Sequence, residues 1–256
     1  MAALRRRNLG WAVGLYRDQG IVLRTWRLGE SDRIVNLLTE RHGKVRAVVK
    51  GVRKTKSRFG ARLEPMVHVS LLFYEGRELD IVTQAEAIEH FRPIREDLAR
   101  LAKASSLLEA TDQLSQERHA NPRLFLMLLG GLRALAAHDA PLLVPAFFLK
   151  LLSSEGFHPL LDECAACGER YRLEAFDLGQ GGVLCVLCAG RGDAVPLSPV
   201  ALDLIRRVLG GDLSGALGVP AGPAVTEVER LATRAMEHHL ERRLRSLPVA
   251  GALATD

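Results

Sequence analysis

Short apolar runs separated by polar turns fill the first 90 residues of the chain. The runs that alternate or concentrate Val, Ile and Leu predict strands over residues 20–27, 33–39, 44–50, 67–74 and 79–85. Five short strands with no long helix among them favour a small β-barrel. The five-stranded barrel that binds oligonucleotides, the OB-fold, fits this pattern, and an SH3-like barrel fits the same spacing.

The pattern changes to a period of three to four residues after Phe91-Arg92-Pro93. Helices are predicted over residues 95–116, 124–138, 141–156, 199–209 and 226–247. Asn121-Pro122 and Ser198-Pro199 each combine an N-cap residue with proline at the first helical position. The chain is therefore expected to be an α+β protein of several domains. The expected order is a loose leader (1–15), an OB-fold DNA-binding domain (16–88), a helical domain in two parts (89–160 and 193–248) around a four-cysteine segment (161–192), and a tail (249–256).

Charge is distributed unevenly between the two halves. The chain has 256 residues, is 48% hydrophobic and carries a net charge of +5. Residues 1–62 hold 16 Lys or Arg and 4 Asp or Glu, whereas residues 63–256 hold 19 and 26. The N-terminal part therefore carries +12 and the remainder −7. A basic unit on an acidic body suggests that one domain meets a polyanion and the other a different partner.

The basic charge concentrates in residues 41–62, which contain nine Lys or Arg and no acid. In the predicted third strand, cationic side chains alternate with Val45, Ala47 and Val49, so one face is cationic. A basic loop follows Gly51. The residues expected to contact DNA phosphates are Lys44, Arg46, Lys50, Arg53, Lys54, Lys56, Arg58 and Arg62. The alternative interpretation is a solvated charge run. Trp26 and Phe59 are the aromatic candidates for base stacking in this part, although Trp26 is expected to pack in the core.

The four cysteines form two Cys-x2-Cys pairs, Cys164/Cys167 and Cys185/Cys188, separated by seventeen residues. This spacing predicts one tetrahedral structural zinc ion held by four thiolates, with a hairpin between the pairs. Four thiolates leave no open position for water, so the zinc is expected to hold a loop and not to catalyse. A redox pair is the alternative for either Cys-x2-Cys taken alone. His158 is expected to be a bystander.

No recognised catalytic or nucleotide-binding motif occurs in the sequence, so no catalytic residue is predicted. No apolar run reaches the roughly 18 residues needed to span a bilayer. Arg5, Arg6 and Arg7 precede an apolar segment that is too short for a signal peptide and lacks a cleavage site. The protein is therefore expected in the cytoplasm, with reduced cysteines.

A series of short motifs resembles the N-terminal domain of the bacterial RecO family of recombination mediators. The motifs are Gly20-Ile21-Val22-Leu23, Gly29-Glu30-Ser31-Asp32-Arg33-Ile34-Val35, Leu38-Thr39-Glu40-Arg41-His42-Gly43, Lys50-Gly51-Val52-Arg53, Ser57-Arg58 and Leu63-Glu64-Pro65. Gly156-Phe157-His158-Pro159-Leu160 and the paired cysteines continue the resemblance, which covers about residues 16–247. The leader before Tyr16 lies outside the pattern.

The resemblance implies an OB-fold barrel followed by a helical domain that contains the zinc site. It also implies a non-enzymatic role in recombinational DNA repair, in the bacterial cytoplasm at the nucleoid. Family members bind single- and double-stranded DNA, anneal complementary strands, and work with RecR to load RecA onto DNA coated by single-strand binding protein. A pocket among the helices with a basic rim would suit the acidic tail of single-strand binding protein. Some members lack the four cysteines, which favours zinc as a scaffold.

Two other functions are consistent with the residues alone. One is a metal-dependent nuclease or another nucleic-acid enzyme, and the other is an RNA- or ribosome-associated zinc-ribbon protein. A second DNA-binding patch could also form outside the barrel, from Arg92, Arg95, Arg123 and Arg133 or from the end of the last helix. The arginines at that end, Arg242, Arg243 and Arg245, are more simply explained as partners of the helix dipole.

Overall fold

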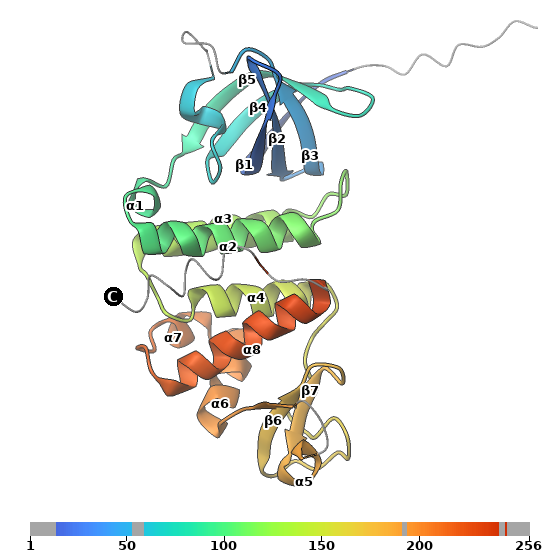
Figure 1. Ribbon diagram of the computed structural model, residues 1–256, viewed down its shortest axis with the longest axis vertical. Coiled ribbons are helices and arrows are strands. Elements are labelled where there is room, and N and C mark those ends of the chain that lie inside the picture. The colour runs from blue at the N-terminus through green and yellow to red at the C-terminus, as the bar shows by residue number, and fades with distance from the viewer. Residues whose placement is uncertain (1–13, 53–58, 191–193, 241–243, 245–256) are drawn as a thin grey trace, which may run out of the picture.

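The structure of the protein, a computed structural model, describes residues 14–52, 59–190, 194–240 and 244. A β-barrel forms one end of the molecule, layers of helices form the middle, and a small β-hairpin forms the far end (Figure 1). The predicted α+β architecture is confirmed.

The barrel consists of β1 (Leu15–Leu28), β2 (Asp32–Thr39), β3 (Gly43–Val49), β4 (His68–Tyr74) and β5 (Asp80–Glu89). The strands close in the order β1-β2-β3-β5-β4, and β1 pairs with β4 to complete the ring. All neighbours are antiparallel except β3 and β5. This is the connectivity of a five-stranded Greek-key barrel of the OB type. Alternate residues such as Val22, Val45 and Phe73 fill its interior and are fully buried.

Strand β1 is longer than the predicted strand over residues 20–27. It begins at Leu15, and its first half pairs with β4, so that Tyr16 lies opposite Phe73 and stacks on it at 4.9 Å. The sequence did not predict this half as a strand, because its polar residues interrupt the apolar pattern. Asp18 is buried, yet it accepts a hydrogen bond from the backbone N–H of Arg41 and lies 2.6 Å from Nδ1 of His42. Tertiary hydrogen bonds thus make a polar residue compatible with a buried position.

The helical part contains α1 (Arg92–Arg95), α2 (Leu98–Leu114), α3 (Pro122–Ala137), α4 (Leu143–Ser154), α6 (Pro199–Gly210), α7 (Leu213–Leu217) and α8 (Pro223–Leu240). The helix predicted over residues 95–116 starts later, at Leu98, because the Asp97 side chain caps it by accepting a hydrogen bond from the Arg100 N–H. Arg95 instead ends the preceding helix α1. Leu98 lies in the first turn of α2 and is 60% exposed.

The other predicted helix starts follow their capping residues. The Asn121 side chain accepts a hydrogen bond from the Leu124 N–H, and the Ser198 side chain accepts one from the Ala201 N–H. Helix α6 is capped at its end by Gly211, whose φ of 105° is accessible to glycine. Helix α8 starts at Pro223, before the predicted residue 226. The predicted continuation to residue 247 lies outside the described residues except for Leu244.

The four-cysteine segment forms the far end of the molecule. Strands β6 (Leu173–Asp177) and β7 (Gly182–Cys185) make the predicted hairpin, β8 (Val195–Pro196) joins β6, and α5 (Val186–Ala189) follows β7. Phe176, Val183 and Leu184 are buried in the same hydrophobic cluster as the helices. The hairpin is therefore anchored to the helical core by apolar packing as well as by its cysteines.

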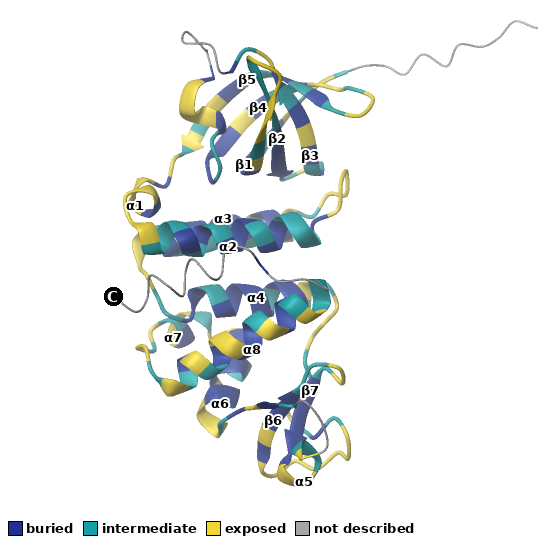
Figure 2. Cartoon of the chain, in the orientation of Figure 1, coloured by how far each residue is buried: buried dark blue, intermediate teal, exposed yellow. Residues whose placement is uncertain are grey.

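The barrel and the helices share part of one core. Ile21, Leu23 and Leu38 point out of the barrel and belong to the same buried cluster as α2, α3 and α4. Figure 2 shows that α2 and α3, which lie beneath the barrel, consist mostly of buried and intermediate residues. The outer surface of β1 and β2 is thus covered at one end by the helical domain.

A short connection after α2 fixes this arrangement. The Lys44 N–H donates to the Gln116 carbonyl at 3.3 Å, and the Arg118 N–H donates to the Lys44 carbonyl at 3.0 Å. The Arg118 guanidinium donates to the fully buried carboxylate of Asp80 at 2.6 Å, and the Tyr16 hydroxyl also donates to Asp80. Burial, together with this bond to Asp80, raises the pKa of Tyr16 above its usual value. Residues 115–119 therefore hold the helical domain against β3.

Candidate nucleic-acid interface and metal centre

The predicted cationic face is present on β3, but its members differ in their surroundings. Val45, Ala47 and Val49 are buried inside the barrel, as the alternation predicts. The intervening side chains point outward, and Arg46 and Lys50 are exposed. Arg46 lies 3.7 Å from Glu117 in a pair that is about half exposed. An ion pair this exposed contributes little and leaves Arg46 available to a polyanion.

Lys44 faces the helical domain and not the solvent. Its ammonium group donates to the Asp112 carbonyl at 2.6 Å and lies 3.7 Å from the Asp112 carboxylate, and its side chain is 14% exposed. A phosphate contact at Lys44 would have to compete with these partners. The arrangement gives Lys44 a role in domain docking.

The basic loop after β3 is described only at its two ends. Arg53, Lys54, Lys56 and Arg58 lie outside the described residues. Arg62 lies in the 3₁₀-helix η1 (Gly60–Leu63) and is exposed. The described members of the predicted set thus lie on β3, in the turn directly after it and on η1.

The two aromatic candidates have surroundings opposite to those expected. Phe59 is 2% exposed and belongs to the barrel core, so its ring faces cannot stack on a base. Trp26 was expected in the core, and this prediction is wrong, because Trp26 is 36% exposed near the end of β1. The guanidinium carbon of Arg24 lies 5.3 Å from the centre of its ring.

Sequence reasoning missed the cations of β1. The strand register places Arg24 opposite Asn36, and Asn36 opposite Arg46, so Arg24 and Arg46 flank one position of β2. Arg24 and Arg27 are both exposed. They precede the basic stretch in sequence and join it only through strand pairing. The alternation along residues 20–27 could have shown which side chains face outward. A bulge between Val22 and Arg24, however, exchanges the inward and outward positions after it.

The four cysteines come together as predicted. The sulfur atoms of Cys164, Cys167, Cys185 and Cys188 all lie within 4.8 Å of one another. The Cys167 and Cys185 sulfurs are 3.8 Å apart. A tetrahedral zinc ion at about 2.3 Å from each sulfur requires neighbouring sulfurs about 3.8 Å apart. The spacing of the thiols therefore fits a zinc tetrathiolate site.

The protonation chemistry of the cluster also fits a cation. Burial acts to raise the pKa of the Cys164 thiol, but the backbone N–H groups of Cys185, Ala166 and Cys167 outweigh it and lower the pKa to about 6. Hydrogen bonds with Cys167 and Cys185 raise the pKa of Cys188 to about 12. The raised pKa of Cys188 disfavours its thiolate unless a cation lies beside it. A divalent metal ion would supply that charge.

Comparison with known proteins decides the family. The model of the recombination protein O N-terminal domain matches residues 13–91, and that of the C-terminal domain matches residues 95–248. The chain belongs to the RecO family. It is 46% identical to the DNA repair protein RecO of Frankia casuarinae over 238 residues, which are 91% of this chain and 97% of that protein. It is 44% identical to the DNA repair protein RecO of Thermobifida fusca over 239 residues, 92% of this chain and 98% of that protein.

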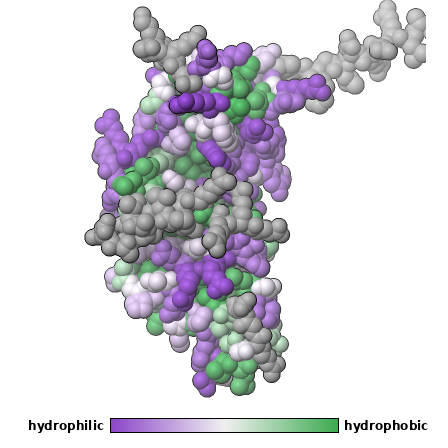
Figure 3. Space-filling model, viewed as in Figure 1, coloured by the Kyte–Doolittle hydropathy of each residue, from purple (hydrophilic) through white to green (hydrophobic). Residues whose placement is uncertain are grey.

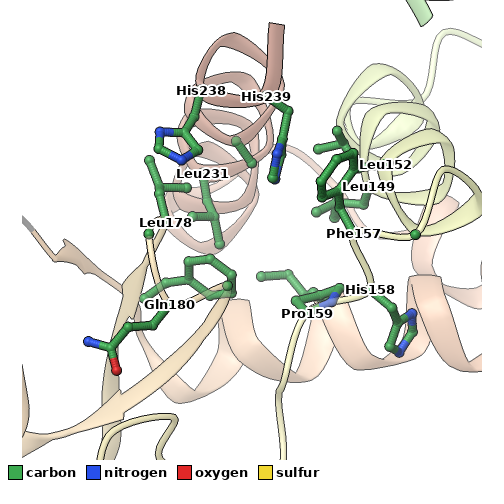
Figure 4. Close-up of a pocket in the computed structure, with 16 residues that line it drawn as sticks. Leu149, Leu152, Phe157, His158, Pro159, Leu178, Gln180, Leu231, His238 and His239 are labelled. Carbon is green, nitrogen blue, oxygen red and sulfur yellow. The ribbon is translucent and has the colours of Figure 1, made fainter. Parts of the chain in front are cut away.

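The helical domain of this RecO-family chain carries a pocket of about 380 Å³. It lies between α4, α8, the turn after α4 and the β6–β7 hairpin (Figure 4). Leu149, Leu152 and Leu231 provide apolar walls. His239 stacks on Phe157 with ring centres 3.9 Å apart, and burial lowers its pKa below the usual value. The pocket is therefore apolar inside, with imidazole groups among its lining.

None of the helices in the described ranges combines the length and the apolarity that a bilayer crossing requires.

Proposed function

We propose that this RecO-family protein is a non-enzymatic recombination mediator that binds single- and double-stranded DNA and anneals complementary strands. The observation that carries the proposal is the acid-free stretch of 22 residues with nine cations, residues 41–62, which includes strand β3 of an OB-type barrel. Arg46, Lys50 and Arg62, together with the loop residues Arg53, Lys54, Lys56 and Arg58, contact phosphates. Such contacts do not depend on base sequence, which is what annealing of arbitrary strands requires.

We propose zinc as the metal of the four-cysteine centre. The donor set is all sulfur, and the sulfur spacing suits a tetrahedral ion. Cys164, Cys167, Cys185 and Cys188 would hold the ion, which joins both ends of the hairpin. The centre lies at the opposite end of the molecule from the barrel (Figure 1), in keeping with a structural role.

Within the bacterial cytoplasm the protein would act at the nucleoid with RecR to load RecA onto DNA coated by single-strand binding protein. The pocket beside α8 is the proposed site for the acidic, apolar-ended tail of single-strand binding protein. Its apolar walls suit the end of the tail, and the N–H groups of its imidazole rings can donate hydrogen bonds to the acidic residues before it.

The pocket can be tested with a peptide in which several Asp residues precede an apolar carboxyl terminus. Phe157 is 47% exposed at the pocket, so Phe157→Ala should leave the fold intact and weaken peptide binding by about 5-fold or more. Tyr171→Ala, which removes an aromatic residue that is 79% exposed just before β6, is the matched control. Equal peptide affinity for both variants would rule out this pocket.

One incubation distinguishes the proposed function from that of a nuclease. A labelled single strand is mixed with the protein and Mg²⁺, and the products are resolved with and without denaturation. We expect a retarded complex that returns strands of the original length. Shortened strands would contradict the non-enzymatic role. Competition with structured RNA should leave single-stranded DNA bound, and preferential displacement by RNA would favour an RNA-associated protein.

A further inference from the structure

The outward face of strands β1, β2 and β3 divides into a covered end and an open end. At the covered end, Ile21 and Leu38 are buried against the helices, and Lys44 bonds to Asp112. Along β2, exposure rises away from the helices, since Leu38 is 1% exposed, Asn36 is 5% exposed and Ile34 is of intermediate exposure. The open end therefore begins at Ile34.

An apolar row crosses the open end. Trp26 pairs with Ile34, and Ile34 pairs with Val48, so the three side chains point from the same face of neighbouring strands. Ile34 and Val48 are partly exposed and belong to neither of the two buried clusters. The row is a surface feature, although it contains three large apolar side chains.

Cations border this row on both sides. Arg24 and Arg46 belong to the neighbouring row towards the helices, because both lie opposite Asn36. Each also lies two residues before a member of the apolar row, Trp26 or Val48. Lys50 lies two residues beyond Val48 on the other side and is exposed. In Figure 3 hydrophilic residues predominate over the barrel, and hydrophobic residues show between them. The next row on the Lys50 side also holds Asp32, which pairs with Leu28, so the positive charge is stronger on the arginine side. An apolar strip with two arginines on one side and a lysine on the other matches the chemistry of a nucleic-acid strand whose bases are unpaired.

From this juxtaposition we propose that Trp26, Ile34 and Val48 form a base-stacking site that makes the barrel favour single-stranded over double-stranded DNA. This proposal rests on the DNA-binding role proposed above and adds residues that contact bases. An exposed indole can stack on any base, since every base has a flat apolar face. The bases of a duplex are already stacked and paired, so they cannot reach the strip. Phosphates on either side would meet Arg24, Arg46 and Lys50.

The test is the affinity of the full-length protein for a homopolymeric single strand and for a duplex of equal length, at one salt concentration. Trp26→Ala should weaken single-strand binding by about 5- to 100-fold and leave duplex binding unchanged. The slope of affinity against salt should stay the same, because no charge is removed. Trp26→Phe should restore part of the loss. Tyr74→Ala removes another exposed aromatic residue of the barrel, 42% exposed on β4, and should change neither affinity.

Fluorescence gives a second measurement that does not depend on an affinity loss. The chain has two tryptophans, Trp11 and Trp26, so in the Trp11→Phe variant only Trp26 emits. Stacking predicts quenching by single strands and little change with duplex. If Trp26→Ala binds single strands as tightly as the unaltered protein, the stacking site is overturned while the DNA-binding role stands. If the unaltered protein binds no DNA, both are overturned.

Discussion

Replacing Cys185 with Ser is expected to reduce the zinc content of the purified protein from one ion per molecule to nearly none. Cys185 ends β7 opposite Leu173, and its sulfur is buried within the cluster. Structural zinc contributes roughly 10–16 kcal/mol of apparent binding free energy in small peptides. Loss of one thiolate therefore removes the strongest link between the two Cys-x2-Cys pairs.

The structural effect of Cys185→Ser should stay local. Amide exchange should quicken over residues 161–190, while the helices keep the apolar contacts of Phe176, Val183 and Leu184. DNA affinity should change by less than about twofold, because the barrel is distant. Leu187→Ser is the matched control, since Leu187 lies between two of the cysteines, is 80% exposed and is not a ligand. Full zinc in Cys185→Ser, or loss of zinc in Leu187→Ser, would contradict the assignment.

Gly43→Ala is expected to lower the free energy of unfolding by about 2–5 kcal/mol. Gly43 has a φ of +66°, which strains any residue with a Cβ atom. A Cβ atom there would also lie 1.9 Å from the carbonyl oxygen of His119, in the connection that holds the helical domain against β3. Backbone atoms cannot move aside as a flexible side chain does, so the connection must shift.

Gly29→Ala is the control that distinguishes backbone strain at a positive φ from a steric clash of the new Cβ atom. Gly29 has a φ of +56°, but nothing lies within 4 Å of the position its Cβ would take. We expect a loss of about 1–2 kcal/mol there, measured for both variants by urea unfolding. In Gly43→Ala alone, the Lys44 and Arg118 amides should exchange faster, because the hydrogen bonds that they donate to the Gln116 and Lys44 carbonyls are disturbed. Equal losses in the two variants would show that residues 115–119 do not clamp the barrel.

Local signals in the sequence predicted the elements that depend on local physics. The helix starts at Asn121 and Ser198 follow from capping within one turn, and the strand β3 follows from strict alternation. The metal cluster follows from two pairs of cysteines, because each Cys-x2-Cys pair places its sulfurs together without help from the rest of the fold.

Features set by distant parts of the chain could not be predicted in this way. Lys44 is held by Asp112, which is 68 residues away, so its alternation with Val45 gave no indication of its burial. Trp26 faces outward because the barrel closes with a bulge just before it. The first half of β1 is a strand because β4 pairs with it. In each case the face of a residue is decided by which element covers it.

The dependence of single-strand affinity on salt tests the cationic face of the barrel most directly. The measurement compares the unaltered protein with the triple variant Lys50→Ala, Arg53→Ala, Lys56→Ala. A control triple variant, Arg170→Ala, Arg172→Ala, Arg234→Ala, removes the same charge from exposed positions of the four-cysteine segment and of α8. Each lost phosphate contact should make the slope of log affinity against log salt shallower by about 0.7, so we expect a change of about 2 for the barrel variant and none for the control. DNA binding through this face would be contradicted if the barrel variant kept the slope and the affinity of the unaltered protein. It would also be contradicted if the control variant lost as much slope and affinity as the barrel variant.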